Sequence, residues 1–212
     1  MLLNTRHSQS PAIGVDFDNT LISYDNVMYN LALQQGLISP NIANNKKLIR
    51  DHIRLLPGGE QQWQMLQASA YGPYIAQAML IEGVVEFFEE CKRRHIQVYI
   101  VSHKTELAHY GDPRPNLRQA ALRWMEEHGF FSEAGFHLSK DHVYFCGTRH
   151  EKIARISALG CAYFIDDLEE VFAEADFPAH VEKILFASDA ANLTDVKVMP
   201  TWEQIRKHLF RD

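Results

Sequence analysis

The sequence predicts an α/β protein, in which a parallel, Rossmann-like sheet is covered by helices and interrupted by a helical insert. Three observations support this prediction. From Gly83 onward, short apolar runs alternate with helix-length segments, which is typical of a parallel sheet with helices on both faces. The first two strand-like runs lie about 80 residues apart, far more than one crossover helix requires. Two of the runs end in closely spaced aspartates, which are costly beside an apolar core.

The predicted strands are short runs of apolar residues, rich in β-branched and aromatic side chains, with the length of buried strands. They cover residues 12–16, 96–102, 143–146, 161–167 and 183–188.

The helices between these strands are predicted from helical spacing of apolar residues and from start and stop signals. Thr148 and Glu151 form a capping-box pattern at one helix start. Gly129 follows the end of another helix, as C-terminal glycines often do. The predicted helices of this part are residues 84–95, 115–129, 148–160 and 201–209.

Residues 24–81 differ in character, because they are rich in Gln, Asn, Leu and Ala and are divided by Pro and Gly breaks. We therefore predict two domains, an α/β core of residues 1–23 and 82–212 and a helical cap insert of residues 24–81. Residues 1–11 are expected to be a loose lead-in. The predicted helices of the insert are residues 27–36, 42–56, 60–72 and 73–80.

Composition excludes several classes of protein. The 212 residues are 46% hydrophobic, enough for one core and a small second unit. The net charge of −6 and the lack of long basic runs argue against nucleic-acid binding. Apolar runs are too short for a membrane span or a signal peptide, so we expect a cytoplasmic protein without a membrane partner. The three cysteines lie in apolar segments, which indicates buried free thiols. The oligomeric state is left open.

The pair Asp16 and Asp18 ends the first predicted strand. Because side chains alternate along a strand, both carboxylates should point to one side and Phe17 to the other. Two like charges held together repel each other, so a bound cation or a reaction is the better explanation. The alternative is an ordinary turn, since Asn19 and Thr20 are good turn residues.

Other polar residues are predicted at the same edge of the sheet, where ligands bind in parallel α/β folds. Ser102 ends the second strand, Asp166 and Asp167 end the fourth, and Lys152 lies in the first turn of a helix. Clustered carboxylates suit Mg²⁺, which prefers oxygen ligands and substrate phosphate. A carboxylate can also attack phosphorus, and a second one can protonate the leaving oxygen. A lysine in a first helical turn opposes the helix dipole, unless it neutralises an anion there.

Four segments resemble the motifs of the haloacid dehalogenase-like (HAD) superfamily. The segment DFDNT (residues 16–20) resembles motif I, VYIVSHKT (98–105) motif II, Lys152 the motif III lysine, and YFIDD (163–167) motif IV. The resemblance implies a HAD-like core with a C1-type helical cap and a Mg²⁺-dependent phosphatase activity. An acid at the position of Asp18 disfavours carbon–halogen cleavage.

The resemblance also implies residue roles. Asp16 would be the nucleophile, and Asp18 the acid and base. Which of Asp166 and Asp167 contacts the metal stays open, since Asp167 could instead cap the following helix. The predicted phosphate-binding residues are Thr20, Ser102, His103 and Lys152, and the predicted metal ligands are Asp16, Asp18 (through its backbone carbonyl), Asp166 and Asp167.

The predicted function is hydrolysis of a small phosphorylated metabolite. A phosphotransferase or phosphomutase using the same residues is one alternative. A binding or regulatory module without turnover is another.

Overall fold

The computed structural model describes residues 11–189 and 192–210, and most of the predicted lead-in lies outside these residues. The described chain contains a six-stranded, all-parallel sheet with strand order β5-β4-β1-β6-β7-β8, so the predicted α/β fold is confirmed. The strands are β1 (Ala12–Val15), β4 (Val98–His103), β5 (Val143–Cys146), β6 (Cys161–Asp166), β7 (Glu182–Leu185) and β8 (Val196–Val198).

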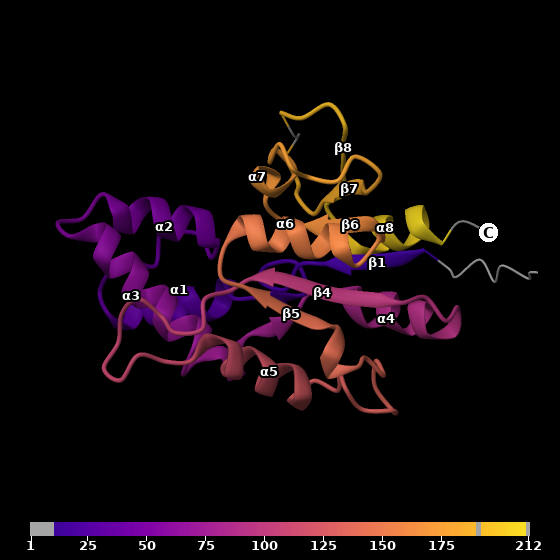
Figure 1. Cartoon of the computed structure of the whole chain (residues 1–212). Coiled ribbons are helices and arrows are strands. Elements are labelled where there is room, and N and C mark those ends of the chain that lie inside the picture. The colour runs from indigo at the N-terminus through magenta and orange to yellow at the C-terminus, as the bar shows by residue number, and fades with distance from the viewer. Residues whose placement is uncertain (1–10, 190–191, 211–212) are drawn as a thin grey trace, which may run out of the picture.

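Helices cover both faces of this sheet, with α4 and α5 below the strands and α6 above them in Figure 1. Neighbouring residues of a strand face opposite cores, as the pleat requires. Ile165 belongs to the core with α4, α5 and α8, whereas Phe164 belongs to the core with α6 and α7. The helices are α4 (Val84–Arg93), α5 (Leu117–Glu127), α6 (Arg149–Ala158), α7 (Glu169–Phe172) and α8 (Trp202–Leu209).

The edge of the sheet differs from the prediction, which lacks β8. This strand has three residues, and Lys197 at its centre is exposed, so no apolar run marks it. The neighbouring strand is also shorter than the predicted residues 183–188, because β7 ends at Leu185. An edge strand pairs on one side only and needs little burial, which leaves a weak sequence signal.

Residues 25–71, which follow β1, contain three α-helices that lie together beyond the carboxyl ends of the strands (Figure 1). Two short antiparallel strands pair where the chain leaves for these helices and where it returns, with Ile22 opposite Leu80. Val27, Ile49 and Trp63 from the helices belong to the same apolar cluster as one face of the sheet. The division into two domains stays a prediction. The elements are β2 (Ile22–Ser23), α1 (Asp25–Gln34), α2 (Lys46–Arg54), α3 (Gly59–Tyr71), the 3₁₀ helix η1 (Ile75–Gln77) and β3 (Met79–Leu80).

The predicted helix over residues 73–80 is wrong. One 3₁₀ turn is followed by an extended Ala78 and by β3, because pairing with β2 outweighs helical propensity. Helix α2 is also shorter than predicted. Its N-cap is Asn45, whose side chain accepts a hydrogen bond from the Leu48 backbone N–H at 3.1 Å.

The predicted start of α6 is confirmed in a modified form. The Thr148 hydroxyl accepts a hydrogen bond from the Glu151 N–H at 3.1 Å. The Glu151 carboxylate accepts from the Gly147 N–H at 2.7 Å, one residue before the partner of a standard capping box. This contact ties the loop after β5 to the first turn of α6.

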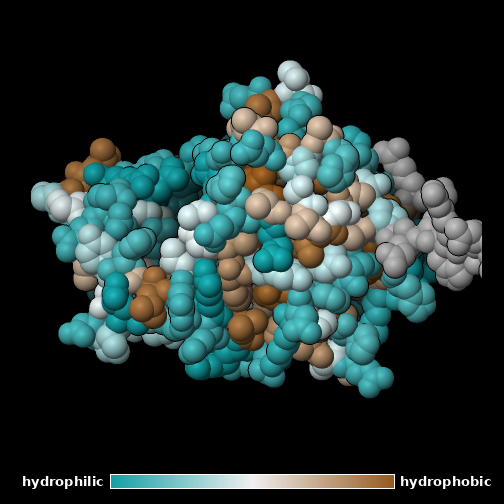
Figure 2. Space-filling model, in the orientation of Figure 1, coloured by the Kyte–Doolittle hydropathy of each residue, from teal (hydrophilic) through white to brown (hydrophobic). Residues whose placement is uncertain are grey.

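On the face drawn in Figure 2, hydrophobic residues are scattered among hydrophilic ones. Within the described residues, every helix is too short or too polar to cross a membrane. The three cysteines are free and buried, as predicted.

Candidate active site

A cluster of carboxylates forms where β1 and β6 end side by side. The two strands are paired with Val15 opposite Ile165, so Asp16 and Asp166 leave the sheet at the same level. The Asp16 N–H donates to the Ile165 carbonyl at 2.9 Å, which fixes the backbone there. One carboxylate oxygen each from Asp16, Asp166 and Asp167 lies within 4.8 Å of the others.

Lys152 enters this cluster from the first turns of α6. Its ammonium donates to Asp16 Oδ1 and to Asp166 Oδ2, each at 2.6 Å, and the side chain is buried. Burial by itself would lower the pKa of Lys152, but the two carboxylates outweigh this and raise it above its usual value. The lysine is therefore charged and bridges two core carboxylates.

Despite the charge of Lys152, the pKa values of Asp16 and Asp167 are raised, so the cluster favours binding of a proton or a cation. Burial raises the pKa of Asp16, Lys152 lowers it, and Asp166 and Asp18 raise it again, to about 7. Burial, followed by the charge of Asp166, likewise raises the pKa of Asp167 well above its usual value. A site that takes up protons near neutral pH also suits a hard divalent cation with oxygen ligands.

The carboxyl group of Asp166 is fully engaged, whereas that of Asp167 is not. Asp166 Oδ1 accepts from the Leu168 N–H at 3.0 Å, and its other oxygen accepts from Lys152. Asp167 has no hydrogen bond or ion pair with any described side chain. Helix α7 begins at Glu169 after Leu168, without a side-chain cap, so the alternative of Asp167 as its N-cap is wrong.

Two buried hydroxyl groups lack a partner among the described residues. Ser102 at the end of β4 and Thr20 in the loop after β1 are both inaccessible to solvent, and neither Oγ atom has a hydrogen bond. A buried hydroxyl without a partner is costly, so such groups mark a place for a ligand or water. The indole of Trp202 donates to the Thr20 carbonyl at 2.9 Å and holds this loop.

Asp18 is positioned by a turn and not by the alternation of a strand, because β1 ends at Val15. The Leu21 N–H donates to the Phe17 carbonyl at 3.0 Å, and Asn19 has a positive φ of 60°. The turn expected as the alternative at Asn19 and Thr20 is thus present. It gives the Asp18 side chain partners outside the carboxylate cluster. The Tyr24 hydroxyl donates to Asp18 Oδ1 at 2.7 Å.

Lys104 is the second partner of Asp18, and the site residues predicted from the sequence do not include it. Its ammonium lies 2.7 Å from Oδ2 and 3.0 Å from Oδ1 of Asp18, and the residue is only 3% exposed. The signal was available in the sequence, because residues two apart on an extended chain share a side. Ser102 and Lys104 therefore both face the site, whereas His103 between them is exposed, with Nε2 at 3.1 Å from the Gly147 carbonyl.

A small cavity of about 180 Å³ adjoins Asp18 and Lys104. The described residues that line it are Asp18, Gln64, Gln67, Ala68, Tyr71, His103, Lys104, Thr105, Ala108, His109 and Leu117.

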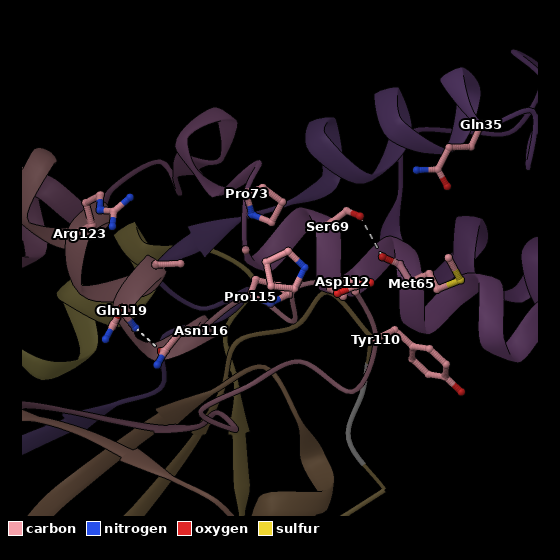
Figure 3. Close-up of a pocket in the computed structure, with 15 residues that line it drawn as sticks. Gln35, Met65, Ser69, Pro73, Tyr110, Asp112, Pro115, Asn116, Gln119 and Arg123 are labelled. Carbon is pink, nitrogen blue, oxygen red and sulfur yellow. Dashed lines mark hydrogen bonds between the residues drawn. The ribbon is translucent and has the colours of Figure 1, made fainter.

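A larger cavity of about 690 Å³ lies elsewhere, between α3 and the loop that leads into α5. Figure 3 shows Met65 and Ser69 of α3 on one side, with Tyr110 and Pro115 of the loop nearby. None of the predicted site residues lines it. The smaller cavity reaches Asp18 and the buried Lys104, whereas the larger one reaches neither, so we assign the side of the site next to Asp18 to the smaller cavity. Asp18 is the one carboxylate among the described residues that line it.

Comparison with known proteins identifies the fold. No protein-family model and no curated protein matches the sequence. A haloacid dehalogenase-like family hydrolase from Streptococcus pneumoniae aligns with a TM-score of 0.59 at 15% identity, over 94% of this chain and 98% of that one. A predicted phosphoglycolate phosphatase from Haemophilus somnus aligns with a TM-score of 0.55 at 13% identity, over 96% of this chain and 100% of that one. Protein Tyrosine Kinase A from Mycobacterium tuberculosis aligns with a TM-score of 0.59 at 15% identity, over 94% of this chain and 98% of that one. At these identities the likeness establishes the fold.

Proposed function

Because the chain has the HAD-like fold, we propose that it is a Mg²⁺-dependent phosphatase that hydrolyses a small phosphomonoester through an aspartyl-phosphate intermediate. The observation that carries the proposal is the cluster at the ends of β1 and β6, where Lys152 bridges Asp16 and Asp166. Unpartnered hydroxyls of Ser102 and Thr20 accompany it. Carboxylates for a cation, together with an ammonium and hydroxyls for an anion, are the groups that phosphoryl transfer requires.

The metal ligands would be Asp16, Asp167 and the backbone carbonyl of Asp18, with Asp166 beside them. The raised pKa values of Asp16 and Asp167 support this assignment, because both carboxylates gain from a nearby positive charge. Bound Mg²⁺ would neutralise phosphoryl oxygens and let the dianion approach the carboxylates.

The protein groups would act in two steps. A carboxylate oxygen of Asp16 attacks phosphorus, the ester P–O bond breaks, and Asp18 gives its proton to the leaving oxygen. Asp18 then takes a proton from water as the water oxygen attacks phosphorus, and the bond to Asp16 breaks. Lys152, Ser102 and Thr20 hold the phosphoryl oxygens during both steps. His103, which lines the same cavity, would contact the substrate from its rim.

We propose the cytoplasm as the place of action and a small phosphorylated metabolite as the substrate. Free, buried cysteines suit a reducing compartment. The small cavity suits a metabolite and not a macromolecule, and the net charge of −6 disfavours nucleic acid. A phosphotransferase or phosphomutase with the same residues remains the second candidate, and a non-catalytic phosphate-binding module the third.

The test is phosphate release from a panel of phosphorylated metabolites with Mg²⁺, compared with Asp16→Asn and Asp18→Asn. Release by the wild type that is lost in both variants supports the phosphatase. Loss of the phosphoryl group from the donor only when an alcohol or sugar acceptor is added, with formation of the phosphorylated acceptor and no free phosphate, supports the phosphotransferase. Binding of inorganic phosphate with no release, unchanged by Asp16→Asn, supports the binding module.

A further inference from the structure

We propose that Lys104 selects the substrate, by binding a carboxylate on the leaving group, so that the substrates are phosphomonoesters of short hydroxy acids. The inference rests on the proposed phosphatase function and adds to it the substrate class and the residue that recognises it.

The first argument is the unused hydrogen-bonding capacity of Lys104. An ammonium has three N–H donors. Asp18 is the acceptor that the described residues provide, with its two oxygens at 2.7 and 3.0 Å. The rings of Phe17 and Tyr71 lie 5.8 and 5.0 Å from the ammonium and add cation–π contacts but no acceptor. One donor is therefore free for a ligand.

The second argument is the place of Lys104 in the cavity. Among the described residues that line this 180 Å³ space, it is the single lysine or arginine. A buried cation attracts an anion strongly, because water does not screen it. Gln64 and Gln67 of α3 line the same space and offer side-chain amides to a polar ligand. The leaving-group side therefore suits a small anion better than a neutral or apolar group.

The site itself contains a precedent for this arrangement. Lys152 bridges two carboxylates, Asp16 and Asp166, at 2.6 Å each. Lys104 is also buried, and it has one carboxylate partner. A substrate carboxylate would give Lys104 the second partner that Lys152 already has.

The third argument is size. A volume of 180 Å³ corresponds to roughly six water molecules at liquid density. This accommodates a fragment of a few heavy atoms that ends in a carboxylate. A nucleoside would have to extend beyond it, and a second phosphate group would fill most of it.

The experiment compares two phosphomonoesters of nearly equal size, phosphoglycolate and 2-hydroxyethyl phosphate. With Mg²⁺, the wild type should show a kcat/KM for phosphoglycolate that is roughly 10- to 100-fold higher, the range expected for a charge-assisted hydrogen bond. Lys104→Met should bring the two values within about threefold of each other, whatever it does to both rates. Lys104→Arg, which keeps the charge, should retain a preference for the carboxylate. Lys207→Met, at an exposed ion pair, is the matched control and should leave the ratio unchanged.

Binding separates this inference from the phosphatase proposal. Calorimetry with Mg²⁺ compares two compounds that cannot be hydrolysed, 3-phosphonopropionate and 3-hydroxypropylphosphonate. Tighter binding of the carboxylate, lost in Lys104→Met, supports the inference even if no ester is hydrolysed, and the phosphatase proposal alone then fails. Equal kcat/KM values for the two esters, or a preference that persists in Lys104→Met, overturn the inference and leave the phosphatase standing. Absence of binding by both phosphonates overturns it as well.

Discussion

The two lysines of the site occupy different surroundings, although each is buried against an aspartate of the same loop. Lys152 lies among residues of the sheet and α6, and its two carboxylate partners end neighbouring strands. Lys104 lies at the border of the core and the helical insert. Its partner Asp18 also binds Tyr24, next to α1, and the ring of Tyr71 on α3 lies beside it.

This difference separates the residues proposed to react with the phosphoryl group from the residue proposed to select the leaving group. The parallel sheet fixes the Lys152 side, because strand register alone brings its carboxylates together. The Lys104 side depends on how the insert packs, and the insert also supplies much of the lining of the small cavity. Substitutions on the two sides should therefore differ in their effects on stability, metal affinity and rate.

Removal of Lys152 should have the largest effect. Lys152→Met leaves Asp16 and Asp166 buried without their shared cation, which is expected to lower the free energy of unfolding by about 3–5 kcal/mol. Lys104→Met should lower it less, by about 1–3 kcal/mol, because the Asp18 side chain is 16% exposed and keeps Tyr24 as a donor.

Urea unfolding without metal measures both values. Lys207→Met is the control and should change the free energy by less than about 1 kcal/mol, because its ion pair with Glu203 is exposed. If Lys152→Met and Lys104→Met lowered the free energy of unfolding equally, the proposed difference between the two sides of the site would be contradicted.

Mg²⁺ affinity should distinguish the Lys152 side of the site, which holds the proposed metal ligands, from the Lys104 side. Asp167→Asn is expected to weaken Mg²⁺ binding at least about tenfold, since it removes the cluster carboxylate that makes no hydrogen bond or ion pair with a described side chain and senses only the more distant positive charges of Lys46 and Lys152. Lys104→Met, which lies on the other side, should change Mg²⁺ affinity by less than about threefold. Calorimetric titration with Mg²⁺ measures both, and a Mg²⁺ affinity unaffected by Asp167→Asn would leave Asp166 as the metal ligand.

The stability of the metal-free protein should depend on pH through Asp16. Its pKa is raised from 3.8 to about 7, so the folded state holds a proton that the unfolded state has lost between these values. The contribution of Asp16 to stability is therefore full below about pH 4 and is lost as pH rises toward 7, with a slope of at most about 1.4 kcal/mol per pH unit. Urea unfolding of the wild type and of Asp16→Asn between about pH 4 and pH 7 measures how the free energy of unfolding depends on Asp16. With Mg²⁺ bound in place of the proton, the free energies of the wild type at these pH values should differ less from one another.

The smallest effect is expected for Tyr24→Phe. It removes the hydrogen bond to Asp18 but keeps the ring that packs edge-on against Tyr71, 4.5 Å between centroids. The expected loss is about 1 kcal/mol in stability, with kcat lowered several-fold because Asp18 is held less firmly. Thermal unfolding and steady-state kinetics measure the two effects. An effect larger than that of Lys104→Met would show that the hydroxyl, and not the ammonium, holds Asp18.

Local signals in the sequence predicted much of this molecule. Alternating apolar runs predicted the parallel sheet, and Thr148 marked the start of α6. Aspartates at two strand ends predicted the carboxylate cluster, because parallel strands deliver their carboxyl ends to one edge. These features depend on residues close together in the chain or on a rule that all parallel sheets obey.

Periodicity and strand-end residues are sufficient to predict the fold class and the carboxylate side of the site, because both depend on local patterns. The tertiary structure decided the rest. Extended pairing across the insert turned residues 79–80 into a strand, and a turn directed the Asp18 side chain to Tyr24 and Lys104. The burial of Lys104 depends on Asp18 and Tyr71, which are distant from it in the chain. Alternation along residues 102–104 indicates which side Lys104 faces, but its contact with Asp18 requires the folded core and its contact with Tyr71 requires the packed insert.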